Sequence, residues 1–325
     1  MIAQSFLKLF PPPEFLLMDH AGLEISDDAI RCLSYKDSFG DRKVRDFMSV
    51  DLPKGLLIGG DTVNMDALRS ELRKFKEKAR LSYVKVSIPE EKAYLFQTNV
   101  PLSDMGSIHQ NIESKLEENI PLLARDAVFN FDLFPATGTD EIRASVSVVP
   151  RTYIEKMLDL LHSVGLRPIA FEIVPRSLGQ VLSKAHDNKT VMTVHVMDQK
   201  IGIYIVSSGV VIFASTASKD PMGPSATPRT SVEDTIAKEI TRVYQYWISR
   251  SDSVAIQDIL LVGQGAETYE SGVRDAIAGL SLNIVIPDIW QNIYNKGGDP
   301  KGNVLPPISK EESLAYAVVA GLALS

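Results

Sequence analysis

The chain has 325 residues, which is longer than one hydrophobic core usually serves, so two domains are expected. Its formal net charge of −7 excludes a general nucleic-acid binder, because the chain supplies no broad cationic field to neutralise phosphates. The single cysteine, Cys32, cannot form an internal disulfide, which favours a reducing compartment; its apolar surroundings predict a small core residue.

The apolar start of the chain does not have the pattern of a secretory leader. Pro11 to Pro13 interrupt the apolar run, and Lys8 is its only cation. No stretch of the sequence reaches the roughly 20 apolar residues of a membrane-spanning helix. We therefore expect a cytoplasmic protein in which residues 1–20 form a tail that packs on its own domain or on a partner.

A first domain is predicted over residues 21–187. It opens with strands at 22–25, 29–35 and 44–49, a helix from the cap Thr62 to about Ala79, and a strand at 83–88. Residues from about 93 to 170 indicate a small inserted α+β subdomain. Its predicted elements are a helix at 108–119, strands at 128–134 and 142–149, and an amphipathic helix at 152–164 that Gly165 ends.

A second domain is predicted over residues 188–325. Its predicted elements are strands at 191–196, 201–206 and 210–214, a helix from Ser231, a strand at 259–262, a helix at 269–277 and a last helix at 313–324. Ser231 and Asp234 have the spacing of a capping box.

The turn Gly263-Gln264-Gly265 joins an apolar strand to a helix. Glycines at such a turn let the backbone pass close to a flat ligand, although the arrangement is common in α/β proteins. Two apolar hairpins precede it, at 21–31 and 193–203, about 170 residues apart. This order suggests two diverged copies of one fold.

Five stretches between Ala21 and Leu324 are characteristic in combination, at 22–26, 117–122, 164–168, 261–266 and 315–324. Together they resemble motifs of the actin-like ATPase superfamily and, within it, of the type IV pilus assembly family PilM, from which this chain is divergent. The resemblance implies an α/β, actin-like (ribonuclease H-like) two-lobed fold with a small inserted α+β subdomain. The given sequence has no Lys or Arg after Lys310, which argues against the related division protein FtsA, since FtsA attaches to membranes through a basic C-terminal helix.

The same resemblance implies a cytoplasmic scaffold of a pilus assembly platform. Its implied partner is the N-terminal tail of a PilN-like inner-membrane protein, bound in a groove between the first subdomain and the inserted one. Pilus motor ATPases are further implied partners. Membrane association would occur only through the partner.

The residues that the resemblance places around a nucleotide are Ser26, Arg31, Lys200, Gly263 and Gly265. Glu24, Asp27 and Asp28 make the first phosphate loop acidic, and ionised carboxylates repel a triphosphate. His195 and Met197 stand where the family has Asp and Gly in the second loop. We therefore expect ATP binding to be weak or lost.

The subdomain that normally closes over the nucleotide is predicted to be reduced, because only residues 216–254 fill its place. We expect no cofactor, with ATP and Mg as the one alternative, and no catalytic or metal-binding residues. The sequence has no pattern of a catalytic triad or metal cluster, so no enzymatic activity is expected. Two alternatives stay open: an active actin-like ATPase, and a cytoplasmic component of a type II secretion platform.

Overall fold

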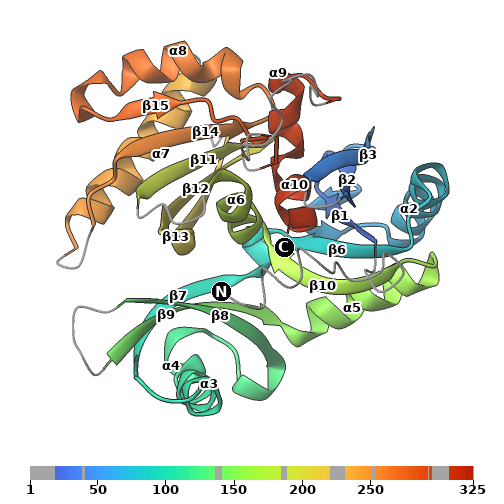
Figure 1. The fold of residues 1–325 in the computed structure, drawn as a ribbon, viewed down its shortest axis with the longest axis horizontal. Coiled ribbons are helices and arrows are strands. Elements are labelled where there is room, and N and C mark those ends of the chain that lie inside the picture. The colour runs from blue at the N-terminus through green and yellow to red at the C-terminus, as the bar shows by residue number, and fades with distance from the viewer. Residues whose placement is uncertain are drawn as a thin grey trace.

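The structure is a computed structural model that describes residues 19–38, 41–135, 141–183, 189–219, 231–250, 254–291, 293–294 and 307–324. Residues 1–18 of the expected N-terminal tail lie outside this part. The described residues form two five-stranded sheets and a smaller three-stranded sheet, with helices between and around them (Figure 1).

The first sheet has the strand order β10-β6-β1-β2-β3. Its strands are β1 (His20–Ile25), β2 (Ala29–Ser38), β3 (Asp41–Asp51), β6 (Tyr83–Ile88) and β10 (Arg167–Ile173). The first three strands form an antiparallel meander, and β6 and β10 continue the sheet parallel to β1. Helices α2 (Met65–Ala79) and α5 (Arg151–Ser163) bury leucines against one face of it.

The second sheet repeats this topology in the order β13-β12-β11-β14-β15. Its strands are β11 (Thr190–Val196), β12 (Lys200–Ser207), β13 (Val210–Ser218), β14 (Asp258–Gly263) and β15 (Asn283–Val285). Again three strands form an antiparallel meander, and two strands continue parallel to the first. Helices α7 (Val232–Ile248) and α8 (Ala266–Ala276) lie on the outer side (Figure 1).

Two helices, α6 (Val174–Leu182) and α10 (Ala317–Leu324), lie between the sheets (Figure 1). They approach closely because glycine leaves room for backbone. A Cβ built on Gly321 would stand 1.9 Å from the Ser177 carbonyl oxygen, and one on Gly22 of β1 would stand 2.2 Å from the Val319 oxygen. The Tyr35 hydroxyl of β2 donates to the Ala320 carbonyl at 3.3 Å. One core cluster therefore joins α6 and α10 to the second sheet and to β2.

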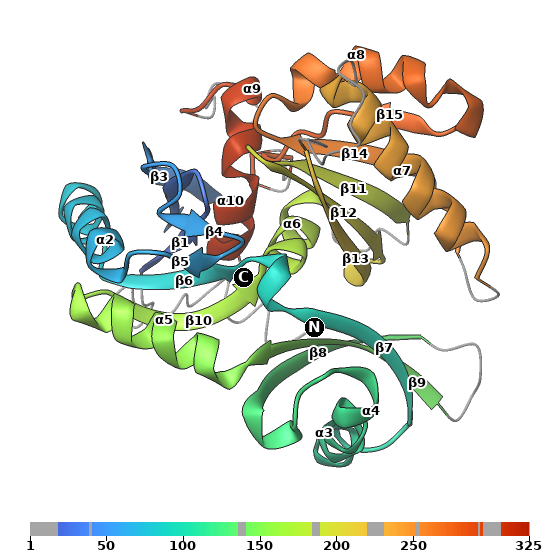
Figure 2. The ribbon, with the colours of Figure 1, turned by 180° about the vertical axis from the view of Figure 1, so that it is seen from behind.

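The third sheet is inserted between β6 and β10. It contains β7 (Tyr94–Pro101), β9 (Glu141–Pro150) and β8 (Ala127–Pro135), in that order across the sheet. It curves over α3 (Met105–Ser114) and α4 (Leu116–Asn119), whose apolar side chains form a separate core with it (Figure 2). Gln97 and Ser145 donate side-chain hydrogen bonds to the carbonyls of Ile212 and Val211, which attaches this subdomain to β13.

The remaining short elements are strands β4 (Leu57–Ile58) and β5 (Asp61–Thr62), helix α9 (Lys310–Ser313), and single 3-10 turns at Glu90–Lys92, Ala124–Asp126, Ala278–Leu280 and Leu314–Tyr316. Between β13 and β14 the described residues form α7 alone; residues 220–230 and 251–253 lie outside the described part.

Several predicted helix ends were wrong. Thr62 lies in β5, and Asn64 caps α2 instead, because its side-chain oxygen accepts from the Ala67 amide at 3.0 Å. The helix expected over 108–119 begins at Met105, after the cap Asp104, and divides near Lys115 into α3 and α4. The predicted capping box of Ser231 and Asp234 at α7 is confirmed.

Candidate functional site

The turn of the first hairpin and the start of β12 meet across a small cavity of about 50 Å³. Lys200 Nζ lies 2.7 Å from an Asp27 carboxylate oxygen and 2.5 Å from a Glu91 oxygen. The Asp27 carboxylate also accepts from the amides of Gly59 and Gly60, at 3.0 and 3.1 Å. Burial opposes charge on Asp27, but these hydrogen bonds outweigh it and hold the pKa of Asp27 below its usual value. The predicted phosphate-binding lysine therefore joins the two lobes through carboxylates of the protein.

Arg31 is held in a second ionic cluster beneath this turn. Its Nη2 lies 2.7 Å from Asp28, and its Nη1 lies 3.6 Å from Glu24 and donates to the Ser26 hydroxyl at 3.4 Å. Ser26 donates in turn to Asp28 at 2.7 Å. Burial raises the pKa of Glu24 to about 7, although Arg31 acts against the shift. The polar groups of Ser26 and Arg31 are thus engaged by neighbouring side chains.

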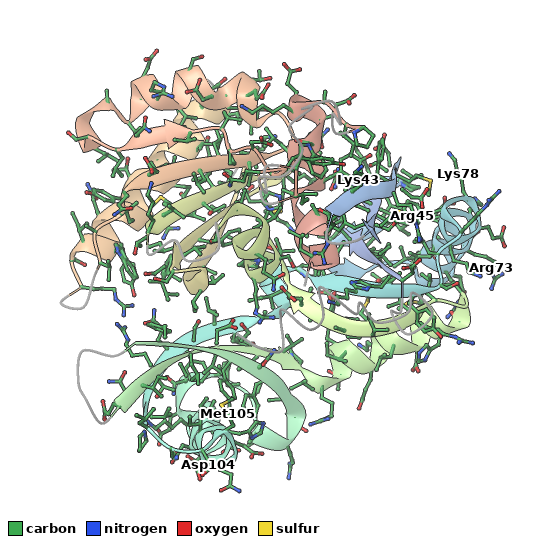
Figure 3. The ribbon with its side chains drawn as sticks, in the orientation of Figure 1. Lys43, Arg45, Arg73, Lys78, Asp104 and Met105 are labelled. Carbon is green, nitrogen blue, oxygen red and sulfur yellow. The ribbon has the colours of Figure 1, made fainter. Side chains whose placement is uncertain are left out.

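The cavity is strongly acidic. Six carboxylate side chains line it, namely Glu24, Asp27, Asp28, Glu90, Glu91 and Asp198. Among the described lining residues Lys200 is the one basic side chain, and two of the six carboxylates already hold it. Labelled basic side chains lie on the outer side of the first lobe, Lys43 and Arg45 on β3 and Arg73 and Lys78 on α2 (Figure 3). This lining does not fit a polyphosphate, since the charges nearest to the phosphates would repel them.

His195 lies on β11 beside the same turn, and it is 7% exposed. Burial, with the positive charge of Arg31, lowers the pKa of His195 to about 4, so the ring is neutral at pH 7. The sequence indicates a strand residue that is half-buried and hydrogen-bonded. The strand is confirmed, but the ring is almost fully buried and its Nδ1 makes no hydrogen bond in the structure, so this part of the prediction was wrong.

The two glycines of the predicted adenosine turn have backbone roles. Gly263 has φ +99°, and a Cβ on it would stand 2.1 Å from the Val196 carbonyl oxygen of the adjacent strand. Gly265 has φ +74° and caps α8, which therefore begins at Ala266, three residues earlier than predicted. Left-handed backbone of this kind favours glycine whether or not a ligand binds.

Four of the five predicted nucleotide residues border two hollows, and these hollows are adjacent, since Arg31 of one donates to Ser26 of the other. Ser26 and Lys200 border the acidic cavity. Arg31 and Gly265 border a separate hollow beside Tyr316, and Gly263 lies against Val196. Within the described residues, no group of three His, Cys, Asp or Glu side chains is arranged to hold a metal ion.

A second cavity, of about 90 Å³, lies between the inserted sheet and the first lobe; we call it the groove. One wall consists of β8 and the facing side of β9, and the other consists of the end of β10 with α5 and α6. Its described lining residues are Ile88, Val128, Phe129, Asn130, Phe131, Asp132, Ser147, Val149, Ile154, Phe171, Glu172, Ile173 and Arg176. Five consecutive residues of β8 line it, because β8 is the edge strand of its sheet and turns this edge to the groove.

An ionic cluster closes the polar end of the groove. Arg176 of α6 donates two hydrogen bonds to Asp132 of β8, at 2.8 and 3.0 Å. Its third nitrogen lies 3.3 Å from Glu172 of β10. These residues were not identified from the sequence. The Glu172 to Arg176 spacing was a visible signal, but nothing local indicated that Asp132 would join them.

No family model matches the chain, and no curated protein matches its sequence. Solved structures do match it. A PilM–PilN type IV pilus biogenesis complex aligns over 94% of this chain and 98% of that chain, with a TM-score of 0.73 and 16% identity. The ethanolamine utilization protein EutJ from Carboxydothermus hydrogenoformans aligns over 97% and 90%, with a TM-score of 0.52 and 12% identity.

No helix among the described residues has the length and apolar character needed to cross a lipid bilayer. The two sheets of identical topology are the two-lobed arrangement expected from the sequence. The helix predicted at 152–164 as part of the insertion packs, as α5, in the core of the first sheet instead. The structural matches agree with it over nearly the whole chain. The chain therefore has an actin-like, two-lobed α/β fold of the kind found in the PilM–PilN complex.

Proposed function

We propose that this protein is a scaffold of a type IV pilus assembly platform, at the cytoplasmic side of the inner membrane. In this proposal the groove binds the N-terminal tail of a PilN-like membrane protein, and that partner holds the scaffold at the membrane. Contacts with pilus motor ATPases belong to the same proposal. The observation that carries it is a groove with an apolar wall and a strand edge open beside it.

The edge of β8 supports binding of an extended segment. In the described residues β8 pairs with β9 on one side, and no strand pairs with its other side. The Phe131 amide donates to the Asn130 side chain at 2.9 Å, a local contact typical of an edge strand. A partner segment that pairs with this edge would gain backbone hydrogen bonds, and its alternate side chains would enter the groove.

We further propose that nucleotide binding is weak or lost and that the protein is not an ATPase. The support is the acidic cavity, in which Lys200 is already held by the carboxylates of Asp27 and Glu91. Isothermal titration with Mg·ATP tests this directly. Affinity in the micromolar range would refute it and would favour an active actin-like ATPase.

Binding is tested with a synthetic peptide of the N-terminal segment of a candidate PilN-like membrane protein. Val128 of β8 lines the groove and is 38% exposed, so Val128→Glu places a charge in the groove without removing a core side chain. We expect at least a tenfold loss of peptide affinity, since a desolvated, unpaired charge costs several kcal/mol. Val63→Glu is the matched control, because Val63 is 64% exposed and lies outside the groove. Equal affinity of both variants would refute the groove as the binding site.

A further inference from the structure

Basic side chains surround a hollow on the outer side of the first lobe, away from the groove. The hollow has a volume of about 880 Å³ and lies between the end of α2 and one face of β2 and β3. It exists because α2 ends at Ala79 and leaves part of this face uncovered. The Lys and Arg residues that line it are Arg45, Lys78 and Arg80. Figure 3 shows Arg45 and Lys78 on this side of the molecule, together with Lys43.

Two lysines of the β2–β3 hairpin extend this basic surface. Cys32 and Ser34 of β2 line the hollow, so Lys36, two residues further along the strand, lies on the same face of the sheet. Lys43 of β3 is directly opposite Lys36 in the strand register. Like charges in this position are destabilising. The fold alone therefore gives no reason for this pair of lysines.

Arg80 has a backbone conformation that favours glycine. It is the C-cap of α2, and its φ of +53° and ψ of +38° are left-handed. A residue with a Cβ is strained in this region, and glycine is the usual residue at such a helix end. Strained residues of this kind are concentrated at functional sites. Because Arg80 lines the hollow, its guanidinium gives a reason for an arginine at this position.

The cations around the hollow outnumber the carboxylates. Asp19 and Asp46 line it, and both are held by Arg45, at 2.5 and 3.0 Å. Within the described residues, four further cations form no ion pair, namely Lys36, Lys43, Lys78 and Arg80. Five cations against two carboxylates leave an excess of three positive charges, in a chain whose formal net charge is −7. The hollow is thus complementary to an anionic partner.

The shape of the site decides between two classes of anion. A flat lipid surface does not reach cations that line a hollow, and Asp19 and Asp46 would repel closely packed phosphate headgroups. A narrow polypeptide chain can enter the hollow, and its carboxylates can be spaced to meet separate cations while avoiding the two acids. An acidic protein segment therefore fits better than a membrane.

We propose that this hollow is a docking site for an extended protein segment rich in Asp and Glu. Carboxylates of the segment pair with the four cations that have no ionic partner, namely Lys36, Lys43, Lys78 and Arg80. The repulsion between the opposed lysines and the strain at Arg80 are then stability given up for binding. This site is separate from the groove, and the inference does not depend on the function proposed for the groove.

Fluorescence anisotropy with the full chain tests the site. The probe is a labelled peptide of about ten residues in which Glu and Ser alternate, and a peptide with Gln in place of Glu is the uncharged reference. One triple variant combines Lys43→Gln, Lys78→Gln and Arg80→Gln. The matched control removes the same number of charges from exposed positions outside the hollow, by combining Lys54→Gln, Lys156→Gln and Lys238→Gln.

We expect the wild type to bind the Glu peptide at low salt, more weakly as salt is added, and not to bind the Gln peptide. The hollow variant should bind the Glu peptide at least tenfold more weakly than the wild type, because three of its ionic partners are missing. The control variant should lose less than twofold, since it has the same net charge but an intact hollow.

Arg80→Gly separates binding from folding. Glycine removes the strain at the end of α2 together with one cation, so the melting temperature should rise while the affinity for the Glu peptide falls. Absence of binding to the wild type, or equal affinities of the two triple variants, would refute the docking site. Vesicles containing phosphatidylglycerol are the last probe. If they bind more tightly than the peptide and lose binding in the hollow variant, the site accepts a lipid surface and the inference is wrong.

Discussion

The bridge between the lobes can be tested by replacing Lys200 with methionine, which keeps the length and apolar stem of the side chain. Lys200, Asp27 and Glu91 are only 21–25% exposed, so solvent screens their charges weakly. At about 4 Å and an effective dielectric constant near 20, each pair attracts by about 4 kcal/mol, and desolvation cancels a large part of this. We expect Lys200→Met to lower the free energy of unfolding by about 3 kcal/mol, because it leaves two carboxylates without their cation.

Urea unfolding at pH 7 measures this loss of free energy. Combining Lys200→Met with Asp27→Asn in a double-mutant cycle isolates the interaction between Lys200 and Asp27. We expect a coupling energy of about 2 kcal/mol between the two substitutions. The pKa of Asp27 is lowered in the folded protein, so its stabilising effect is present above the unfolded pKa and lost as pH falls. The decrease in the free energy of unfolding on acidification should therefore be smaller in Lys200→Met than in the wild type. Lys78→Met, an exposed lysine of α2, is the control and should change stability by less than about 0.5 kcal/mol. A coupling energy below about 0.5 kcal/mol would refute the idea that this bridge holds the lobes together.

Three further predictions concern single residues. Gly321→Ala should lower the free energy of unfolding by about 3 kcal/mol or abolish folding, because the new Cβ would overlap the Ser177 carbonyl oxygen. Thermal unfolding measures this, and an unchanged melting temperature would contradict the close approach of α10 to α6. Burial raises the pKa of Glu24 to about 7, so its contribution to stability is complete below about pH 4.5 and is lost between there and pH 7. In urea unfolding, the free energy of unfolding of the wild type should therefore fall by about 3 kcal/mol over this pH range relative to that of Glu24→Gln. A difference between the two proteins that stays constant with pH would show that the pKa of Glu24 is not raised. Asn64→Ala should lower the free energy of unfolding by about 1 kcal/mol in urea unfolding, because α2 loses its N-cap. An unchanged free energy would show that Asn64 does not cap the helix.

Glycines at close backbone approaches help to build the actin-like fold of this chain independently of any ligand. Gly263 is needed where the end of β14 lies close to the Val196 carbonyl of β11, and Gly265 is needed at the start of α8. Neither requirement depends on a ligand. Gly22 and Gly321 are needed for the packing of α10 between the sheets. These glycines build the frame of the fold, so their presence alone does not indicate that a nucleotide binds.

The sequence by itself determined the elements and their order. Apolar alternation indicated both hairpins, the inserted subdomain and the strand before Gly263, because side-chain periodicity is a local property. The acidic residues of the first turn, Asp27 and Asp28, could also be recognised directly. The Ser231 capping box was visible for the same reason, since its partners are three residues apart.

Only the tertiary structure decided what these residues do. Lys200 was predicted to face phosphates, but it meets Asp27 and Glu91, residues more than 100 positions away in the chain. The ionic cluster of Asp132, Glu172 and Arg176 exists because β8 of one subdomain, β10 of another and α6 converge on one groove. Such contacts depend on how separately folded units pack, and the energies that place them come from burial and long-range pairing, which local sequence patterns do not encode.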